Sequence, residues 1–207
     1  MSNDDSLIMV VSAPSGTGKT SICRSLLQEI PTLKFSVSYT TREPRKGEVE
    51  GRDYHFVSAA VFQEKIRAGE FAEWAENYGH LYGTSRVVIE ETRRQGGDIL
   101  LDVEPRGARA IKECYPEGVF VFVLPPDLEE LHKRLWKRGD GDEEMRRRRF
   151  LKAEDEIKEV FWYDYIVVND RLEEAIARVK AIYLAEKCRR ERQMAIISTF
   201  LAKRPSL

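Results

Sequence analysis

The sequence predicts an α/β fold in which helices flank a parallel β-sheet and a small mixed α/β lobe is inserted into this core. Two observations lead to this prediction. Along most of the 207 residues, apolar runs alternate with stretches of helical periodicity, which favours a parallel sheet with right-handed crossovers. Residues 35–84 interrupt this alternation with short segments and frequent turn residues. The length favours one domain, 1–207.

Four strands of the core are predicted where apolar residues follow one another without interruption, as expected for strands buried on both faces. These strands lie at 7–13, 97–103, 118–124 and 163–170. Helices are predicted where apolar residues keep helical spacing. They lie between the first strand and Pro31, and at 85–95, 106–115, 127–138 and 143–161. The core is therefore expected to comprise 1–34, 85–137 and 151–207.

Two segments depart from the core pattern. Residues 35–84 carry short alternating stretches typical of an antiparallel sheet, then a short helix and a hairpin-like piece, so we expect a separate small lobe. The segment 138–150, RGDGDEEMRRRRF, is dense in charge and poor in apolar residues, which predicts a mobile surface lid.

The C-terminal stretch, from 171 to about 203, is predicted to be one long helix or two helices in tandem. A stripe that begins at Leu172 and runs to Tyr183 should pack on the core. A second apolar stripe at Ile197, Phe200 and Leu201 lies beyond the core, which indicates contact with another subunit in a homo-oligomer.

The composition limits the compartment and the partners. Lys and Arg number 34 and Asp and Glu number 35, so the net charge of -1 indicates neither nucleic acid nor a membrane as a partner. Cys23, Cys114 and Cys188 form no Cys-x-x-Cys pair, which fits a reducing compartment. The polar, acidic N-terminus is unlike a targeting segment, and the apolar run after it is far shorter than the ~20 residues that span a bilayer. We therefore expect a cytoplasmic protein.

The segment LIMVVSAPSGTGKT, residues 7–20, predicts a phosphate-binding loop between a buried strand and a helix N-terminus. Gly16 and Gly18 allow the backbone to approach phosphate oxygens. Lys19 can reach the β- and γ-phosphates of ATP, and the Thr20 hydroxyl can ligand Mg²⁺. The residues expected to bind ATP in this loop are Ala13, Pro14, Ser15, Gly16, Thr17, Gly18, Lys19 and Thr20. The core is thus predicted to be of the P-loop NTPase type.

One position of the loop departs from the strict pattern, because Ala13 stands where a glycine is expected. This position ends the strand and does not enclose the phosphate, so alanine is tolerated there if its φ is negative. The alternative interpretation is a glycine-rich turn with an ordinary surface lysine. The apolar strand before the loop and the amphipathic helix after it favour the phosphate loop.

A second cluster, SVSYTTREPRKGEVEGRDYHF at 36–56, suggests what receives the phosphoryl group. Arg42 and Arg45 can clamp phosphate oxygens, and the Tyr54 hydroxyl can add a contact. An acceptor that itself carries a phosphate needs such a clamp. Taken alone, however, the cluster also fits a solvated basic loop.

The motifs SAPSGTGKT, TTREPRKGEVEGRDYHF, FAEWAENYGHLYGTS, LLDV and RLWKRG…RRRF occur in the order seen in guanylate kinases, which the chain resembles from about residue 7 to about 186. The second motif is much more specific than the P-loop. The resemblance implies ATP and GMP or dGMP as substrates, with Mg²⁺, and Ala or Gly is often found at the first loop position in this family. It also implies a GMP phosphate site at Ser38, Arg42, Arg45 and Tyr54.

The resemblance implies further roles. Glu73 corresponds to the guanine-binding carboxylate, which can accept hydrogen bonds from N1–H and N2–H₂, and Thr84 and Tyr82 lie near the base. Asp102 corresponds to a carboxylate near Mg²⁺ or its waters. Arg138 and Arg149 correspond to lid residues at the transferring phosphoryl group. Asn169 corresponds to a residue near adenine, and Glu104 corresponds to a GMP contact. The catalytic set is expected to be Lys19, Arg42, Arg138 and Arg149.

The chain also departs from the family. It has DVEPRGA where the family usually has Asp-x-Asp followed by a bulky residue and Gln-Gly, so Glu104 replaces an aspartate and has one more methylene to place. The lid is unusually basic, with Arg146 where the family tends to be apolar. The expected reaction is phosphoryl transfer from ATP to GMP. The alternatives are a catalytically silent binding module of the same fold and a P-loop kinase with another acceptor.

Overall fold

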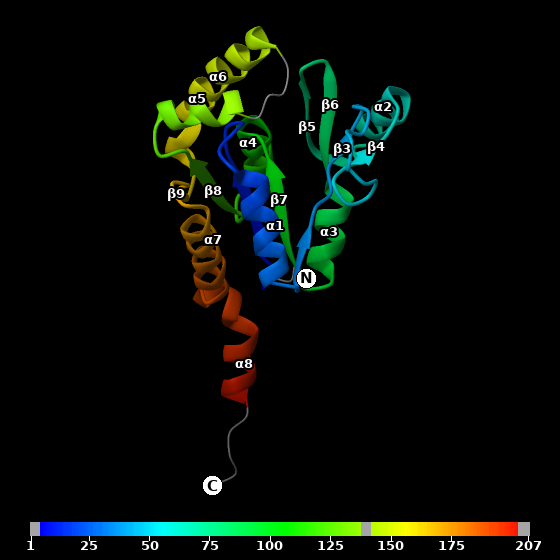
Figure 1. Ribbon diagram of the computed structural model, residues 1–207. Helices are drawn as coiled ribbons and strands as arrows, with labels where there is room; N and C mark the ends of the chain where they lie inside the picture. Colours follow the sequence, from blue (N-terminus) through cyan, green and yellow to red (C-terminus); the bar gives the residue numbers. More distant parts are fainter. Residues whose placement is uncertain (1–4, 138–141, 203–207) are drawn as a thin grey trace.

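The computed structural model describes residues 5–137 and 142–202, and their arrangement is shown in Figure 1. A five-stranded sheet forms the core, with strand order β2-β7-β1-β8-β9 and parallel pairing throughout. Its strands are β1 (Ile8–Ser12), β2 (Leu33–Phe35), β7 (Asp98–Val103), β8 (Val119–Leu124) and β9 (Tyr165–Val168). The four predicted strands are confirmed. The three-residue strand β2 is an addition at the edge of the sheet.

Helices cover both faces of this sheet, because successive residues of its buried strands point to opposite sides. On β1, Met9 and Val11 pack with α1 and α7, whereas Ile8 and Val10 pack with α3 and α4. The bounds of these helices are α1 (Lys19–Glu29), α3 (Arg86–Arg94), α4 (Pro105–Cys114) and α7 (Leu172–Lys187). The core is therefore a sheet with an apolar layer on each side, as the fold class predicts.

A second, four-stranded sheet with order β4-β3-β6-β5 lies beside the core (Figure 1). Its elements are β3 (Tyr39–Thr40), β4 (His55–Phe56), α2 (Ala59–Arg67), β5 (Phe71–Asn77) and β6 (His80–Ser85). The helix begins where Ser58 accepts a hydrogen bond from Val61 N, as an N-cap does. The sheet is mixed, because β3 pairs with β4 in parallel and with β6 in antiparallel. The β3–β6 and β5–β6 pairs have the predicted antiparallel character, and the parallel β3–β4 pair departs from it.

Two further helices stand over the carboxyl ends of the core strands. They are α5 (Leu128–Lys137) and α6 (Glu143–Ile157), and the 3₁₀ helix η1 (Lys158–Trp162) follows α6. Leu131 and Leu135 of α5 pack against Ala153 of α6. The predicted lid segment 138–150 is helical from Glu143 onward, whereas residues 138–141, including the predicted site residue Arg138, lie outside the described residues.

The C-terminal stretch consists of two helices in tandem, which decides between the two predicted arrangements. The 3₁₀ helix η2 (Arg190–Gln193) separates α7 from α8 (Met194–Ala202), which projects away from both sheets (Figure 1). Most of the predicted stripe on α7 is buried, although Leu172 at its start is 37% exposed. No helix within the described ranges is long and apolar enough to cross a bilayer.

Candidate functional site

The phosphate loop connects β1 to α1 and is built around two glycines with φ in the left-handed region, Gly16 (94°) and Gly18 (92°). A side chain at either position would also collide with a neighbour. A Cβ at Gly18 would lie 2.5 Å from Asn169 Nδ2, and one at Gly16 would lie 2.9 Å from Leu135 Cδ2. Glycine is therefore required at both positions for conformational and for steric reasons.

Ala13 is compatible with the loop that follows it. It is buried in the core cluster around β1, and Tyr78 is the only non-glycine residue with positive φ in the described part of the chain. Thr17 closes the loop, because its hydroxyl donates to Pro14 O at 2.9 Å. The condition under which alanine is tolerated at this position is therefore met.

Lys19 extends from the first turn of α1 to the carboxyl end of β7. Its Nζ lies 2.6 Å from Asp102 Oδ1 and donates to Val103 O at 2.8 Å. Burial by itself lowers the pKa of Lys19, but the charge of Asp102 and its hydrogen bond, with the charge of Glu104, outweigh burial and raise the pKa. The lysine therefore keeps its proton at every physiological pH.

One cavity of about 840 Å³ runs from the phosphate loop to the second sheet. Most of the predicted site residues line it, although they come from both sheets and from α6. Those residues are Ala13, Pro14, Ser15, Gly16, Thr17, Gly18, Lys19, Thr20, Ser38, Arg45, Tyr54, Glu73, Tyr82, Asp102, Glu104 and Arg149. Donor and acceptor residues predicted from separate motifs are thus brought together around one space.

Three predicted residues lie behind the cavity wall. Arg42 is only 11% exposed, and its guanidinium makes two hydrogen bonds to the Glu48 carboxylate, at 2.8 and 2.9 Å, and one to Glu43 O at 2.6 Å. Thr84 is buried and donates to Glu73. Asn169 is buried as well, and its Nδ2 donates to Thr17 O at 2.6 Å. In this structure Asn169 thus supports the phosphate loop.

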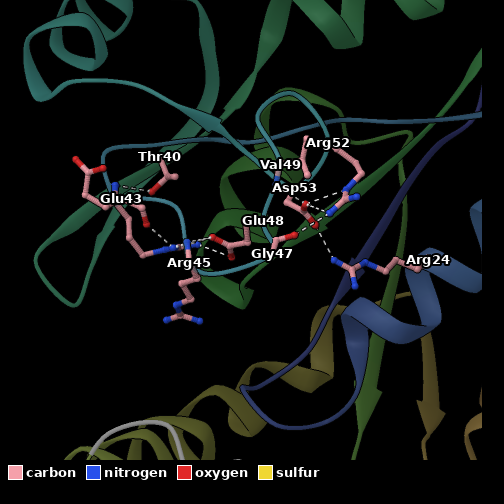
Figure 2. A network of polar contacts seen from close by, with 10 residues as sticks. Arg24, Thr40, Glu43, Arg45, Gly47, Glu48, Val49, Arg52 and Asp53 are labelled. Carbon is pink, nitrogen blue, oxygen red and sulfur yellow. Dashed lines mark hydrogen bonds and ion pairs between the residues drawn. The ribbon is translucent and has the colours of Figure 1, made fainter.

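The two arginines of the second cluster differ in their partners; Arg45 and Glu48 are labelled in Figure 2. Glu48 binds the Arg42 side chain and also accepts from the backbone N of Arg45 at 2.7 Å. The Arg45 guanidinium points away from Glu48 and lines the cavity, with no hydrogen bond or ion pair to any described residue. Arg45 is therefore free to bind an anion, whereas Arg42 already has a carboxylate partner.

A second carboxylate holds the same loop against the core. Asp53 accepts from Val49 N at 2.9 Å and from the Arg52 side chain, and it forms an ion pair with Arg24 of α1 at 2.7 Å (Figure 2). These contacts make the Asp53 pKa lower than usual, chiefly through the bond from Val49 N. The loop that carries Arg45 is thus tied to the helix that follows the phosphate loop.

Glu73 lines the cavity from β5. Its Oε1 accepts from Thr84 Oγ1 at 2.6 Å, and α4 approaches so closely that a Cβ at Gly107 would lie 2.9 Å from Glu73 Oε2. Burial raises the pKa of Glu73, and the Thr84 hydrogen bond offsets only part of this effect. A part-buried carboxylate at this place can recognise a ligand that offers two neighbouring N–H donors.

Helix α6 brings Arg149 to the phosphate loop, where its Nη2 donates to Ser15 Oγ at 2.8 Å. The same helix places Lys152 and Glu156 on the cavity wall, together with Asn77, Tyr78 and Arg106 from other elements. Sequence reasoning missed these five residues. For Lys152 and Glu156 a signal exists, because spacings of three and seven from Arg149 lie on one helix face.

Comparison with known proteins agrees with this site. A protein-family model described as guanylate kinase matches residues 6–186. The guanylate kinase of Syntrophus aciditrophicus is 54% identical over 184 residues, which cover 89% of this chain and 88% of that protein. The guanylate kinase of Symbiobacterium thermophilum is 49% identical over 198 residues, which cover 95% of this chain and 94% of that protein. The crystal structure of guanylate kinase from Anaplasma phagocytophilum superimposes with a TM-score of 0.78 at 33% identity, covering 98% of this chain and 97% of that one. The chain belongs to the guanylate kinase family.

Proposed function

We propose that this protein transfers the γ-phosphoryl group of ATP to GMP, and to dGMP, giving ADP and GDP or dGDP. The observation that carries the proposal is that one cavity is lined both by a phosphate loop with its lysine and by a part-buried carboxylate, Glu73. The first binds a nucleoside triphosphate, and the second matches the N1–H and N2–H₂ donors of guanine. Adenine offers no such pair of donors.

The donor half of the proposed site is the phosphate loop. Gly16, Gly18 and Lys19 would hold the ATP phosphates at the N-terminus of α1. Thr20 and Asp102 line the cavity with oxygen ligands that suit Mg²⁺, a cation bound through few protein groups and several waters. Among the described residues no group of three His, Cys, Asp or Glu could hold a metal by itself, which agrees with such sparse ligation. When bound, Mg²⁺ neutralises charge on the phosphates.

The acceptor half lies on the second sheet. Ser38, Arg45 and Tyr54 would bind the GMP phosphate, and Arg42, fixed by Glu48, would support the loop that presents Arg45. Tyr54 keeps its proton, because burial raises its pKa. The base would lie against Glu73, with the remaining proposed contacts from Thr84, Tyr82 and Glu104.

Phosphoryl transfer requires that the two substrates be positioned and that the charge on their phosphates be neutralised. The acceptor phosphate oxygen is already ionised near neutral pH, so no general base is needed. Lys19 and Arg149 would surround the transferring group, and Arg138 is proposed for the same role although it lies outside the described residues. Closure of the GMP lobe and the lid would keep water away from the reactive phosphate.

An acceptor panel tests the proposal. ADP formation from ATP is measured with GMP, dGMP, AMP, CMP or UMP as acceptor, for the wild type and for Glu73→Gln. We expect GMP and dGMP to be preferred, and the variant to lose this preference. Preference for AMP would exclude the guanine assignment, and no turnover with any acceptor would favour the silent binding module.

Two further features belong to the proposal. The core (1–34, 85–137 and 151–207), the GMP lobe (35–84) and the lid (138–150) would act as separate parts of one domain, although Phe35 still pairs in the core sheet. Cys23, Cys114 and Cys188, all described, are unpaired, which supports a cytoplasmic location.

We also propose a homo-oligomer through α8. Phe200 is 78% exposed, and Ile196 and Leu201 are exposed beside it. Side chains of this kind are seldom left in water without a partner. Light scattering should give a mass above that of one chain for the wild type and a monomer for Phe200→Ser; a monomeric wild type would contradict the idea.

A further inference from the structure

Three side chains from distant parts of the sequence form a closed ring on the cavity wall. Lys152 Nζ, on α6, lies 2.7 Å from Glu104 Oε2 and 2.9 Å from Asn77 Oδ1. Asn77 Nδ2 donates to Glu104 Oε1 at 2.8 Å. Asn77 ends β5, and Glu104 lies between β7 and α4, so the ring joins the second sheet, the core sheet and α6.

The ammonium group of Lys152 is surrounded by protein oxygens. Its Nζ also lies 3.4 Å from Glu156 Oε1 and 5.3 Å from the centre of the Tyr78 ring. A lysine has three N–H donors, and three oxygen acceptors already surround this one. Burial lowers the pKa of Lys152, but Glu104 and Glu156 outweigh this effect and raise it, so the side chain is a permanent cation.

Lys152 and Arg149 share one face of α6, because they are three residues apart. Arg149 reaches Ser15 of the phosphate loop, and Lys152 reaches the acceptor side of the cavity. Helix α6 is therefore fastened on both sides of the space in which the substrates would meet. Two anchors of this kind fix the rotation of the helix as well as its distance from the site.

We propose that Lys152 is a positioning residue, which couples the acceptor side of the cavity to the placement of Arg149 for phosphoryl transfer. This inference rests on the proposed function. Lys152 acts through Glu104 and Asn77 on one side and through the helix on the other, and it does not touch the reacting atoms. The Asn77–Glu104 bond persists without it, so its loss frees α6 while leaving these two residues of the acceptor side joined.

The test compares Lys152→Met with Lys158→Met in steady-state transfer to GMP. Lys158 is the matched control, because its replacement removes the same charge one residue past the end of α6, where the exposed Lys158 side chain pairs only with Asp155 among the described residues. We expect Lys152→Met to lower kcat by about ten- to a hundredfold, with the KM for ATP nearly unchanged. The melting temperature should fall as well, because the buried Glu156 carboxylate loses its ion-pair partner. Lys152→Arg should recover much of kcat, since it restores the cation.

The outcomes separate this inference from the proposed function. A wild type that forms no GDP would remove the function on which it rests. A wild type that forms GDP, with an unchanged kcat in Lys152→Met or an equal loss in Lys158→Met, would overturn the positioning role alone. A loss of melting temperature without a loss of kcat would make the ring purely structural. If Lys152→Met does not fold, Asn77→Ala opens the ring from the other sheet and is judged by the same criteria.

Discussion

Gly107→Ala should weaken GMP binding without weakening the fold. The added Cβ would lie 2.9 Å from Glu73 Oε2 and 3.1 Å from its Cδ, whereas ordinary contacts begin at 3.4 Å. The carboxylate must therefore retreat by about 0.5 Å, against a short hydrogen bond from Thr84 that holds its other oxygen. Misplacing an ionised acceptor of two guanine N–H donors costs about 1.5–3 kcal/mol. The KM for GMP should rise about ten- to a hundredfold.

Two measurements separate this effect from damage to the fold. Gly107 lies inside α4 with an ordinary backbone conformation, so alanine should stabilise the helix by about 0.5–1 kcal/mol. Thermal melting should therefore give an equal or higher melting temperature, and the KM for ATP should stay constant. An unchanged KM for GMP in a folded variant would refute the reasoning, because it would mean that Glu73 either yields freely or does not bind the base.

Three more predictions address the loop, the pH dependence and the core. Glu48→Gln removes the carboxylate that holds Arg42, so steady-state kinetics should show a KM for GMP about tenfold higher. Glu73 must be ionised to accept hydrogen bonds from guanine, and its pKa is raised. Calorimetric titration should therefore show that GMP affinity falls as the pH decreases, and that the fall begins at a higher pH than for a glutamate of ordinary pKa. Glu73→Gln should remove this dependence. The buried Asp98 carboxylate accepts hydrogen bonds from Leu7 N, the Tyr183 hydroxyl and Lys187. Asp98→Asn should therefore lower the free energy of unfolding by about 2–3 kcal/mol and the melting temperature by about 5–10 °C, with unchanged GMP kinetics.

Much of the core could be predicted because its signals are local. A strand buried on both faces must be apolar throughout, as in β8, where all six residues of VFVFVL are apolar. The strand β2 has only three residues, and Lys34 at its centre is exposed, so neither length nor periodicity marks it. The parallel pairing of β3 with β4 could not be predicted for the same reason, since each of these strands has only two residues.

The site divides in a similar way. The phosphate loop is a contiguous motif whose chemistry follows from its own residues, so its placement could be predicted. The pairing of Arg42 with Glu48 could not be predicted, because a spacing of six residues does not reveal that the loop folds back on itself. The approach of α4 to Glu73 depends on how the two sheets pack, and no local pattern contains that information.

Counting hydrogen-bond donors clarifies which cations of the site can take up phosphate. Lys19 has three donors, of which Asp102 and Val103 O use two, so one remains for an oxygen of the nucleotide. The Arg45 side chain retains all five of its donors among the described residues, whereas Lys152 donates to two oxygens and pairs with a third at 3.4 Å. The positive charges around the cavity therefore fall into two kinds, those that can bind a substrate and those that hold the protein around it. A lysine or arginine on the wall of a phosphate site is accordingly assigned by its remaining donors, because charge alone does not distinguish the two.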